Sequence, residues 1–217
     1  MLRAIDLLNP QHHNPRIVAD CADFLRDEGD AAAADALYAD LRKWHPRAVE
    51  RDRAFLARAE IAFAGGRSAD ALAFLERLLK ETGFSPRVSD AQILKARLLV
   101  DQGDAGEGLD VLGKLLEDQA VPSKAKAAAL FWSGEILAGQ GEVLRATAFF
   151  ERVYLTYGKY GRLVAQSYLR RAELLEGLGK REEAVEVYRE LAGRADMKEH
   201  KEFRAARDRL KELEQDA

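Results

Sequence analysis

The segment Gly179–Tyr188, GKREEAVEVY, has the pattern of a tight turn followed by a helix. Glycine suits such a turn because it adopts left-handed backbone angles without a steric penalty. Ala184 and Tyr188 are four residues apart, so they lie on the same face of the helix that follows the turn. A small and a large residue on one face are typical of a helix that packs closely against a neighbour. Weaker copies of this segment recur through the chain, and they decide the fold.

Five glycines, each followed by a predicted helix, recur at intervals of 37 or 38 residues: Gly29, Gly66, Gly103, Gly141 and Gly179. Seven residues before each glycine is a small residue: Ala22, Ala59, Ala96, Gly134 and Ala172. Five residues after it is another: Ala34, Ala71, Gly108, Ala146 and Ala184. Nine residues after it is a large one: Tyr38, Leu75, Leu112, Phe150 and Tyr188. The residues five and nine after each glycine are four apart, so they lie on one face of the second helix, and the residue seven before it lies on the first helix. The sequence therefore predicts a helix–turn–helix unit that is repeated five times.

The composition favours an all-α fold. Ala, Leu, Glu, Arg and Lys, all good helix formers, dominate the 217 residues, and only five prolines occur. The formal net charge of −3 provides no overall field that would attract nucleic acid or an anionic membrane. A single cysteine excludes an internal disulfide, so packing must hold the fold together.

The repeated unit resembles the tetratricopeptide repeat, a helix–turn–helix of about 34 residues. That family has a small residue in its first helix, and an alanine and an aromatic residue in its second. The fifth unit is the most similar, with Ala172, Gly179, Ala184 and Tyr188 at these places. The signature Trp of the first helix is absent from every unit, and Tyr168 occupies its position in the fifth. The resemblance implies an all-α, right-handed superhelical solenoid of antiparallel helix pairs.

The repeat register also divides the chain into segments. We expect five helix pairs at about residues 15–48, 52–85, 89–122, 127–160 and 165–198. Residues 1–14 are expected to form a trailing half-repeat or an N-terminal cap, because Leu2, Ile5 and Leu8 lie on one helical stripe. The charged segment 199–217 has a narrow apolar stripe of Phe203, Ala206, Leu210 and Leu213. Solenoids need a terminal helix that is apolar on one side only, so we expect a capping helix here.

Two local patterns concern individual helices. Ser89-Asp90-Ala91-Gln92 has the form of a capping box, and Ser123 follows Pro122 as a predicted N-cap. The second helix of the third unit contains Gly106, Gly108 and Gly113. Because each glycine inside a helix costs about 1 kcal/mol relative to alanine, this helix is expected to be a flexible centre of the array.

No pattern of catalytic or metal-binding residues is present. Cys21 lies beside Ala22 on the expected inward face, so we expect a buried, unreactive thiol. Metal sites need three or four converging ligands, and the spacing of the four histidines does not suggest one. The segment 103–108 superficially resembles a phosphate-binding loop, but it follows a helix and no Lys-Ser/Thr comes after it. We therefore expect a protein that is not an enzyme and has no cofactor or metal.

The sequence also limits the partners and the location of the protein. Tyr154, Tyr157 and Tyr160 alternate with Lys159 and Arg162, and such a segment can stack on nucleic-acid bases. Because acidic residues are in surplus, we expect these tyrosines to pack between the fourth and fifth units instead, with no nucleic-acid partner.

No apolar run approaches the roughly 18 residues that span a bilayer, so no membrane insertion is expected. Residues 1–10 lack the features of a signal peptide, and the pattern leaves a cytoplasmic or periplasmic location open.

A surface is the main candidate for function. In tetratricopeptide repeats the first helix of each unit lines a concave groove, which implies that residues ten, six and three before each glycine line it here. The positions that we expect to bind a partner are Leu56, Glu60, Phe63, Ile93, Arg97, Val100, Phe131, Glu135, Leu169 and Glu173. Apolar residues flanked by charges are typical of a groove for an extended or helical peptide. The same apolar residues would also suit packing between units, and the pattern leaves both readings open.

The resemblance implies that this chain lacks the residues needed to bind one class of ligand. Members that bind chaperone tails hold a terminal carboxylate with Lys, Arg and Asn in the groove, whereas Ala19, Asp23, Leu56 and Glu60 stand at the corresponding places here. We therefore expect a scaffold that binds another protein or a peptide in the groove. Two alternatives stay open: a structural spacer or assembly segment of a larger bacterial envelope or secretion protein, and a regulatory domain of a multidomain enzyme or transcription factor. In either case the chain would be part of a longer repeat array or protein.

Overall fold

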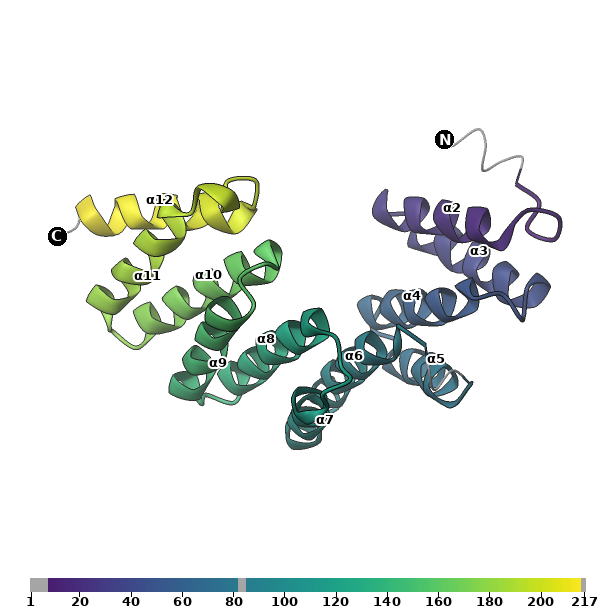
Figure 1. Ribbon diagram of the computed structural model, residues 1–217, viewed down its shortest axis with the longest axis horizontal. Coiled ribbons are helices and arrows are strands. Elements are labelled where there is room, and N and C mark those ends of the chain that lie inside the picture. The colour runs from purple at the N-terminus through teal and green to yellow at the C-terminus, as the bar shows by residue number, and fades with distance from the viewer. Residues whose placement is uncertain (1–7, 82–84, 216–217) are drawn as a thin grey trace. The chain divides into compact units, whose positions relative to one another are not determined.

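A computed structural model describes residues 8–81 and 85–215, and within this part of the chain every secondary-structure element is a helix (Figure 1). It divides into two compact units, residues up to 102 (unit 1) and from 103 onward (unit 2). Unit 1 contains α2 (Pro15–Asp27), α3 (Ala31–Trp44), α4 (Glu50–Ala64), α5 (Ser68–Glu81) and α6 (Val88–Asp101). Unit 2 contains α7 (Ala105–Glu117), α8 (Ser123–Gly139), α9 (Val143–Thr156), α10 (Gly161–Gly177), α11 (Arg181–Gly193), a 3₁₀ turn (Ala195–Met197) and α12 (Lys201–Gln215).

The turns between helices follow the glycine register of the sequence. Gly29, Gly66, Gly103, Gly141 and Gly179 have φ values between 72° and 94°, and within the described residues no other residue has a positive φ. At Gly179, the amide N–H groups of Gly179 and Lys180 donate to the carbonyls of Glu176 and Leu175, which closes the end of α10. A side chain in this left-handed region would be strained, so glycine is required by the backbone itself.

The core lies between the helices of each pair, at the positions that the register predicts. Every small residue seven before the turn glycine and every large residue nine after it is buried. In unit 1, Tyr38 of α3 packs in the cluster that contains Ala22 of α2. In unit 2, Tyr188 of α11 packs with Ala172 of α10. The small residue allows the two helices to approach, and the large residue fills the space beside it.

Two of the predicted helix starts are wrong by one or two residues. α6 begins at Val88, so Ser89 lies inside the helix and does not cap it, and the Ser85 hydroxyl oxygen accepts from the Arg87 N–H instead. α8 begins at Ser123 itself, with Pro122 at the N-cap position. Pro122 can precede the helix because it has no N–H to leave unsatisfied. Asn14 caps α2 and Asp30 caps α3, each with a side-chain oxygen that accepts from a backbone N–H of the first turn.

The described part of the chain begins at Leu8 and ends with α12. Residues 1–7, with Leu2 and Ile5 of the expected N-terminal stripe, lie outside the described residues. Asn9 begins a turn, and its backbone carbonyl accepts from the amide N–H groups of His12 and His13. At the other end, α12 packs on α10 and α11 with Phe203, Ala206 and Leu213 buried and Leu210 half-buried, as the stripe in the sequence predicts.

Candidate functional site

In each unit, the candidate surface consists of side chains on the first helix of each pair. We call it the first-helix face, and it consists of the predicted binding positions on α4 and α6 in unit 1 and on α8 and α10 in unit 2. In unit 1, α4 packs beside both α2 and α6, and in unit 2, α10 packs beside both α8 and α12. Neighbouring first helices are therefore adjacent within each unit, which brings their predicted residues together. The spacing of residues in the sequence does not specify which residues meet between neighbouring first helices.

In unit 1, charged side chains bridge adjacent first helices. Arg26 of α2 donates from Nη1 to Oε2 of Glu60 on α4 at 3.1 Å. The Arg97 guanidinium of α6 lies 5.1 Å from the ring centroid of Phe63, a cation–π contact across α4 and α6. The protein around Glu60 displaces water from its partly exposed carboxyl and raises its pKa, and Arg26 only partly opposes this. Burial lowers the pKa of Arg97, with Glu60 acting in the opposite direction.

In unit 2, Arg170 of α10 connects two predicted binding residues. Its Nε donates to Oε1 of Glu135 on α8 at 2.7 Å, and its Nη1 donates to Oε2 of Glu173 on α10 at 2.7 Å. These two hydrogen bonds raise the pKa of Arg170, although burial acts against them. Arg209 of α12 bonds to Glu176 of α10, which also accepts from the Tyr188 hydroxyl at 3.2 Å. Charged bridges thus join each neighbouring pair of helices from α8 to α10 to α12.

A hollow of about 550 Å³ opens between α10, α11 and α12 in unit 2. Its lining residues are Leu169, Glu173, Glu176, Gly177, Tyr188, Ala205 and Arg209. Three of these, Leu169, Glu173 and Glu176, lie at the offsets of ten, six and three residues before Gly179 that the register predicts. The contributions of α12 were not predicted, because the repeat register ends before the terminal helix.

The apolar residues of the first-helix face fall into two groups. Leu56, Ile93 and Phe131 are buried, with exposed fractions of 6%, 6% and 8%. Phe131 makes edge-to-face contacts with Trp132 and Phe150, so its ring belongs to the core of unit 2. The other group, Phe63, Val100 and Leu169, is partly exposed. A ligand can contact this second group without any rearrangement of the core.

Sequence reasoning missed the arginines that order this surface. Arg170 and Arg209 lie outside the three offsets that define the predicted lining, and Arg26, three residues before Gly29, was not among the predicted binding positions. A signal for them exists in the spacing: Arg170 follows Glu135 by nearly one repeat, and it precedes Glu173 by three residues on the same helix. Oppositely charged residues at about one repeat period are candidates for a bridge between neighbouring first helices.

Two other residues that the sequence offered as candidates for chemistry, Cys21 and Tyr154, are buried. Cys21 is buried, as predicted. Tyr154 lies in α9 and stacks on Tyr168 of α10 with ring centroids 3.8 Å apart, so it packs between the fourth and fifth helix pairs. Among residues 8–81 and 85–215, no three His, Cys, Asp or Glu side chains form a group that could hold a metal ion. The same residues include no helix that is long and apolar enough to cross a bilayer.

The raised pKa of Glu60 leads to a prediction about pH. Between the unfolded pKa of about 4.5 and the higher folded pKa, the folded state binds more protons, so this group lowers stability as pH rises. Glu60→Gln removes that cost. The melting temperature of Glu60→Gln relative to the unmodified protein is therefore expected to be higher at pH 7 than at pH 4, as measured by circular dichroism. Glu76→Gln, an exposed site on α5, controls for the loss of one negative charge, and an equal pH trend in both variants would contradict the prediction.

Comparison with known proteins identifies the repeat. Residues 93–160 and 166–196 match two models of the tetratricopeptide repeat family. No curated protein matches the chain. Among solved structures, a thermophilic TPR protein of Thermus thermophilus is 20% identical, with a TM-score of 0.61 over 92% of this chain and 98% of that one.

Two further solved structures have the same architecture. The type IV pilus biogenesis factor PilW is 19% identical, with a TM-score of 0.55 over 88% of this chain and 97% of that one. The TPR protein YrrB is 17% identical, with a TM-score of 0.50 over 95% of this chain and 97% of that one. At these identities the likeness concerns the fold, and it confirms the predicted all-α solenoid class. The chain contains tetratricopeptide repeats, which are matched at residues 93–160 and 166–196.

Proposed function

We propose that this protein is a non-enzymatic scaffold that binds a peptide segment of a partner protein along its first-helix face. The tetratricopeptide repeat fold supports protein interaction in general terms. YrrB is described as a TPR protein with an unusual peptide-binding site, which is a property of that protein. We further propose that the five predicted segments are the repeat units, with α12 as the terminal cap.

One observation carries the proposal. Phe63, Val100 and Leu169 are apolar and partly exposed, and each lies on a helix whose charged side chains bridge to the neighbouring first helix. Fixed bridges hold the helices in register, so the apolar side chains are presented on an ordered surface. A peptide would bury its own apolar side chains against them, and Arg97, Glu135 and Glu173 would favour one register over another.

The burial of Phe131 determines which substitutions can test the proposal. Phe131→Glu would place a charge in the core of unit 2, and its loss of binding would not be distinguishable from unfolding. Val100→Glu in unit 1 and Leu169→Glu in unit 2 are better choices, because both side chains are partly exposed.

We expect Val100→Glu and Leu169→Glu to abolish capture of the native partner, since each places a charge where the partner buries apolar surface. The measurement is affinity capture with quantitative mass spectrometry. Val49→Glu and Leu155→Glu are matched controls, because these residues are apolar, 84% and 72% exposed, and absent from the first-helix face. Circular dichroism melting checks that every variant is folded. Equal capture by all four variants would refute the first-helix face as the binding surface.

A further inference from the structure

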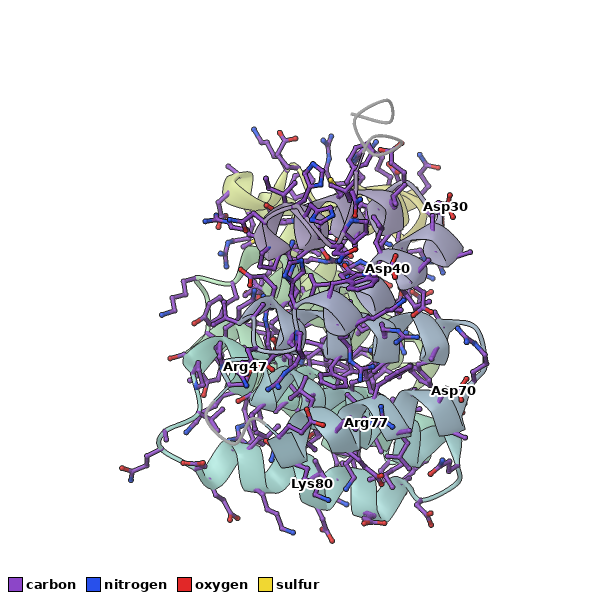
Figure 2. All side chains as sticks on the ribbon, turned by 90° about the vertical axis from the view of Figure 1, so that its right-hand side faces the viewer. Asp30, Asp40, Arg47, Asp70, Arg77 and Lys80 are labelled. Carbon is purple, nitrogen blue, oxygen red and sulfur yellow. The ribbon has the colours of Figure 1, made fainter. Side chains whose placement is uncertain are left out.

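Four arginines of unit 1, Arg42, Arg51, Arg58 and Arg77, lie close together, and Arg47 lies in the connection just after α3. We call this group the arginine patch, and it consists of Arg42, Arg47, Arg51, Arg58 and Arg77. Figure 2 labels two of these arginines, Arg47 and Arg77, and the nearby Lys80 of α5. The overall charge of the protein is −3, so this local excess of positive charge is not a consequence of composition.

Aromatic rings of the core hold two of the guanidinium groups. Arg42 lies over Phe55 with 4.1 Å between its Cζ and the ring centroid, and Arg58 lies over Phe74 at 4.4 Å. A guanidinium stacked on a ring keeps its N–H groups at the edge, where they can donate to an anion. Both side chains are therefore ordered before any ligand arrives.

The patch has fewer carboxylates than guanidinium groups. Asp35 accepts from Arg58 at 2.7 Å, and Arg51 lies 3.6 Å from Asp52 and 3.7 Å from Glu81. Within the described part of the chain, no carboxylate lies within 4.0 Å of the three remaining arginines, which are Arg42, Arg47 and Arg77. Burial and the nearby Arg58, Arg77 and Arg51 together lower the pKa of Arg42, which agrees with an unbalanced positive field.

We propose that the arginine patch is a second binding surface, separate from the first-helix face, for an acidic segment of a partner protein. Guanidinium groups recognise carboxylates through paired, charge-assisted hydrogen bonds, so charge complementarity favours this partner. The proposal is independent of the function proposed for the first-helix face, because the residues of the two surfaces do not overlap.

The distribution of the arginines favours an extended acidic segment over a single small anion. Arg51 and Arg58 are seven residues apart on α4, which corresponds to about 10 Å along the helix. Arg42 and Arg77 come from helices on either side, and packed helix axes are about 8–10 Å apart. One inorganic phosphate cannot reach all of these groups at once. An extended chain with carboxylates every two or three residues spaces its charges by about 7–10 Å, which matches the patch.

Helix dipoles account for only part of this arrangement. Arg42 and Lys80 lie in the last turns of α3 and α5, where positive charge offsets the carbonyl end of a helix. Arg47 lies in the connection between α3 and α4, and Arg77 lies one turn before the end of α5. These two exposed residues have no such role, and they are the best sites for a test.

The test measures binding of a fluorescein-labelled peptide of alternating Glu and Ser by fluorescence anisotropy at low ionic strength. We expect the unmodified protein to bind it and not to bind the same peptide with Gln in place of Glu. The double variant Arg47→Gln/Arg77→Gln is expected to raise the Kd about tenfold, since each removed charge weakens the attraction several-fold. Arg16→Gln/Arg67→Gln, which removes two exposed arginines elsewhere in unit 1, is expected to change the Kd by less than about twofold.

Three outcomes would overturn the proposal. They are an equal loss of affinity in both double variants, absence of binding to the acidic peptide, and tighter binding of a single-stranded oligonucleotide than of the peptide. Val100→Glu and Leu169→Glu should leave binding of the acidic peptide unchanged, so failure of this surface and failure of the first-helix face are distinguishable. Melting curves of each double variant establish that the fold is retained.

Discussion

Gly134→Ala is expected to destabilise the protein by about 1–2 kcal/mol, although alanine is normally the better residue inside a helix. A Cβ atom at Gly134 would lie 2.9 Å from two ring atoms of Phe150. Phe150 is fully buried and packs edge-to-face on Phe131 at 5.5 Å, so its ring has no free space to enter. The strain of moving the ring exceeds the gain in helix propensity. Urea unfolding monitored by circular dichroism measures the difference.

A matched variant has the opposite expected sign. Gly113 lies inside α7, and a Cβ atom there would have no neighbour within 4 Å. Gly113→Ala is therefore expected to stabilise by about 0.5–1 kcal/mol. Shortening the opposing side chain with Phe150→Leu should remove the clash, so that Gly134→Ala becomes neutral or stabilising in that background. If Gly134→Ala stabilised the unmodified protein as much as Gly113→Ala does, the close packing at Phe150 would be contradicted.

Asp23→Ala is expected to cost about 1–3 kcal/mol, because it leaves a buried hydroxyl without its acceptor. Asp23 accepts hydrogen bonds from the Tyr38 hydroxyl and from the Arg53 guanidinium, whose Nε lies 2.8 Å from Oδ2. Tyr38 is fully buried and only 25% of the Asp23 side chain is exposed, so water replaces the carboxylate poorly. In a Tyr38→Phe background the hydroxyl is absent, and Asp23→Ala should cost less by about 0.5–2 kcal/mol. Additive effects of the two substitutions would contradict the coupling.

The same carboxylate should make stability depend on acid. Burial raises the pKa of Asp23, but the hydrogen bonds from Arg53 and Tyr38 more than offset this, and its pKa is lowered below 3.8. The folded state then binds fewer protons than the unfolded state, so the stabilisation is present above the unfolded pKa and is lost as pH falls through the folded value. The urea midpoints of Asp23→Ala and the unmodified protein should therefore converge below about pH 4. Asp20→Ala, which removes the more exposed partner of Arg53, is the control.

The backbone pattern could be predicted from the sequence because it depends on local chemistry. The turn glycines were identified from spacing alone, and each has the left-handed φ that a turn requires. The small and large residues of the register were predicted to face inward, and they are buried. At Gly134, the pattern predicted a small residue. Whether glycine or alanine is required depends on the position of the Phe150 ring, which only the folded structure specifies.

The candidate surface could be predicted only in part, because it depends on contacts between units. Position in the repeat identified Glu60, Phe63 and Arg97 as residues of one surface, but not the contacts between helices, which are the Arg26–Glu60 hydrogen bond and the Arg97–Phe63 cation–π contact. It also could not separate Phe131, which packs in the core, from Leu169, which is partly exposed. Both residues have the same offset from their turn glycine. Their exposure differs because Phe131 packs on Phe150 and Leu169 borders the hollow beside α12.

The bridges between neighbouring first helices have a consequence for how such a chain can be rearranged. Four of them pair an upstream carboxylate with a downstream arginine: Asp20 and Asp23 with Arg53, Glu135 with Arg170, and Glu176 with Arg209. One runs in the opposite sense, from Arg26 to Glu60. Helix pairs that carry different charges where their first helices meet are not interchangeable, because exchanging two helix pairs would leave some charged side chains without an opposite charge. The order of the helix pairs is thus encoded in polar side chains, separately from the apolar register that makes each pair fold. Recombination or design has to keep both patterns.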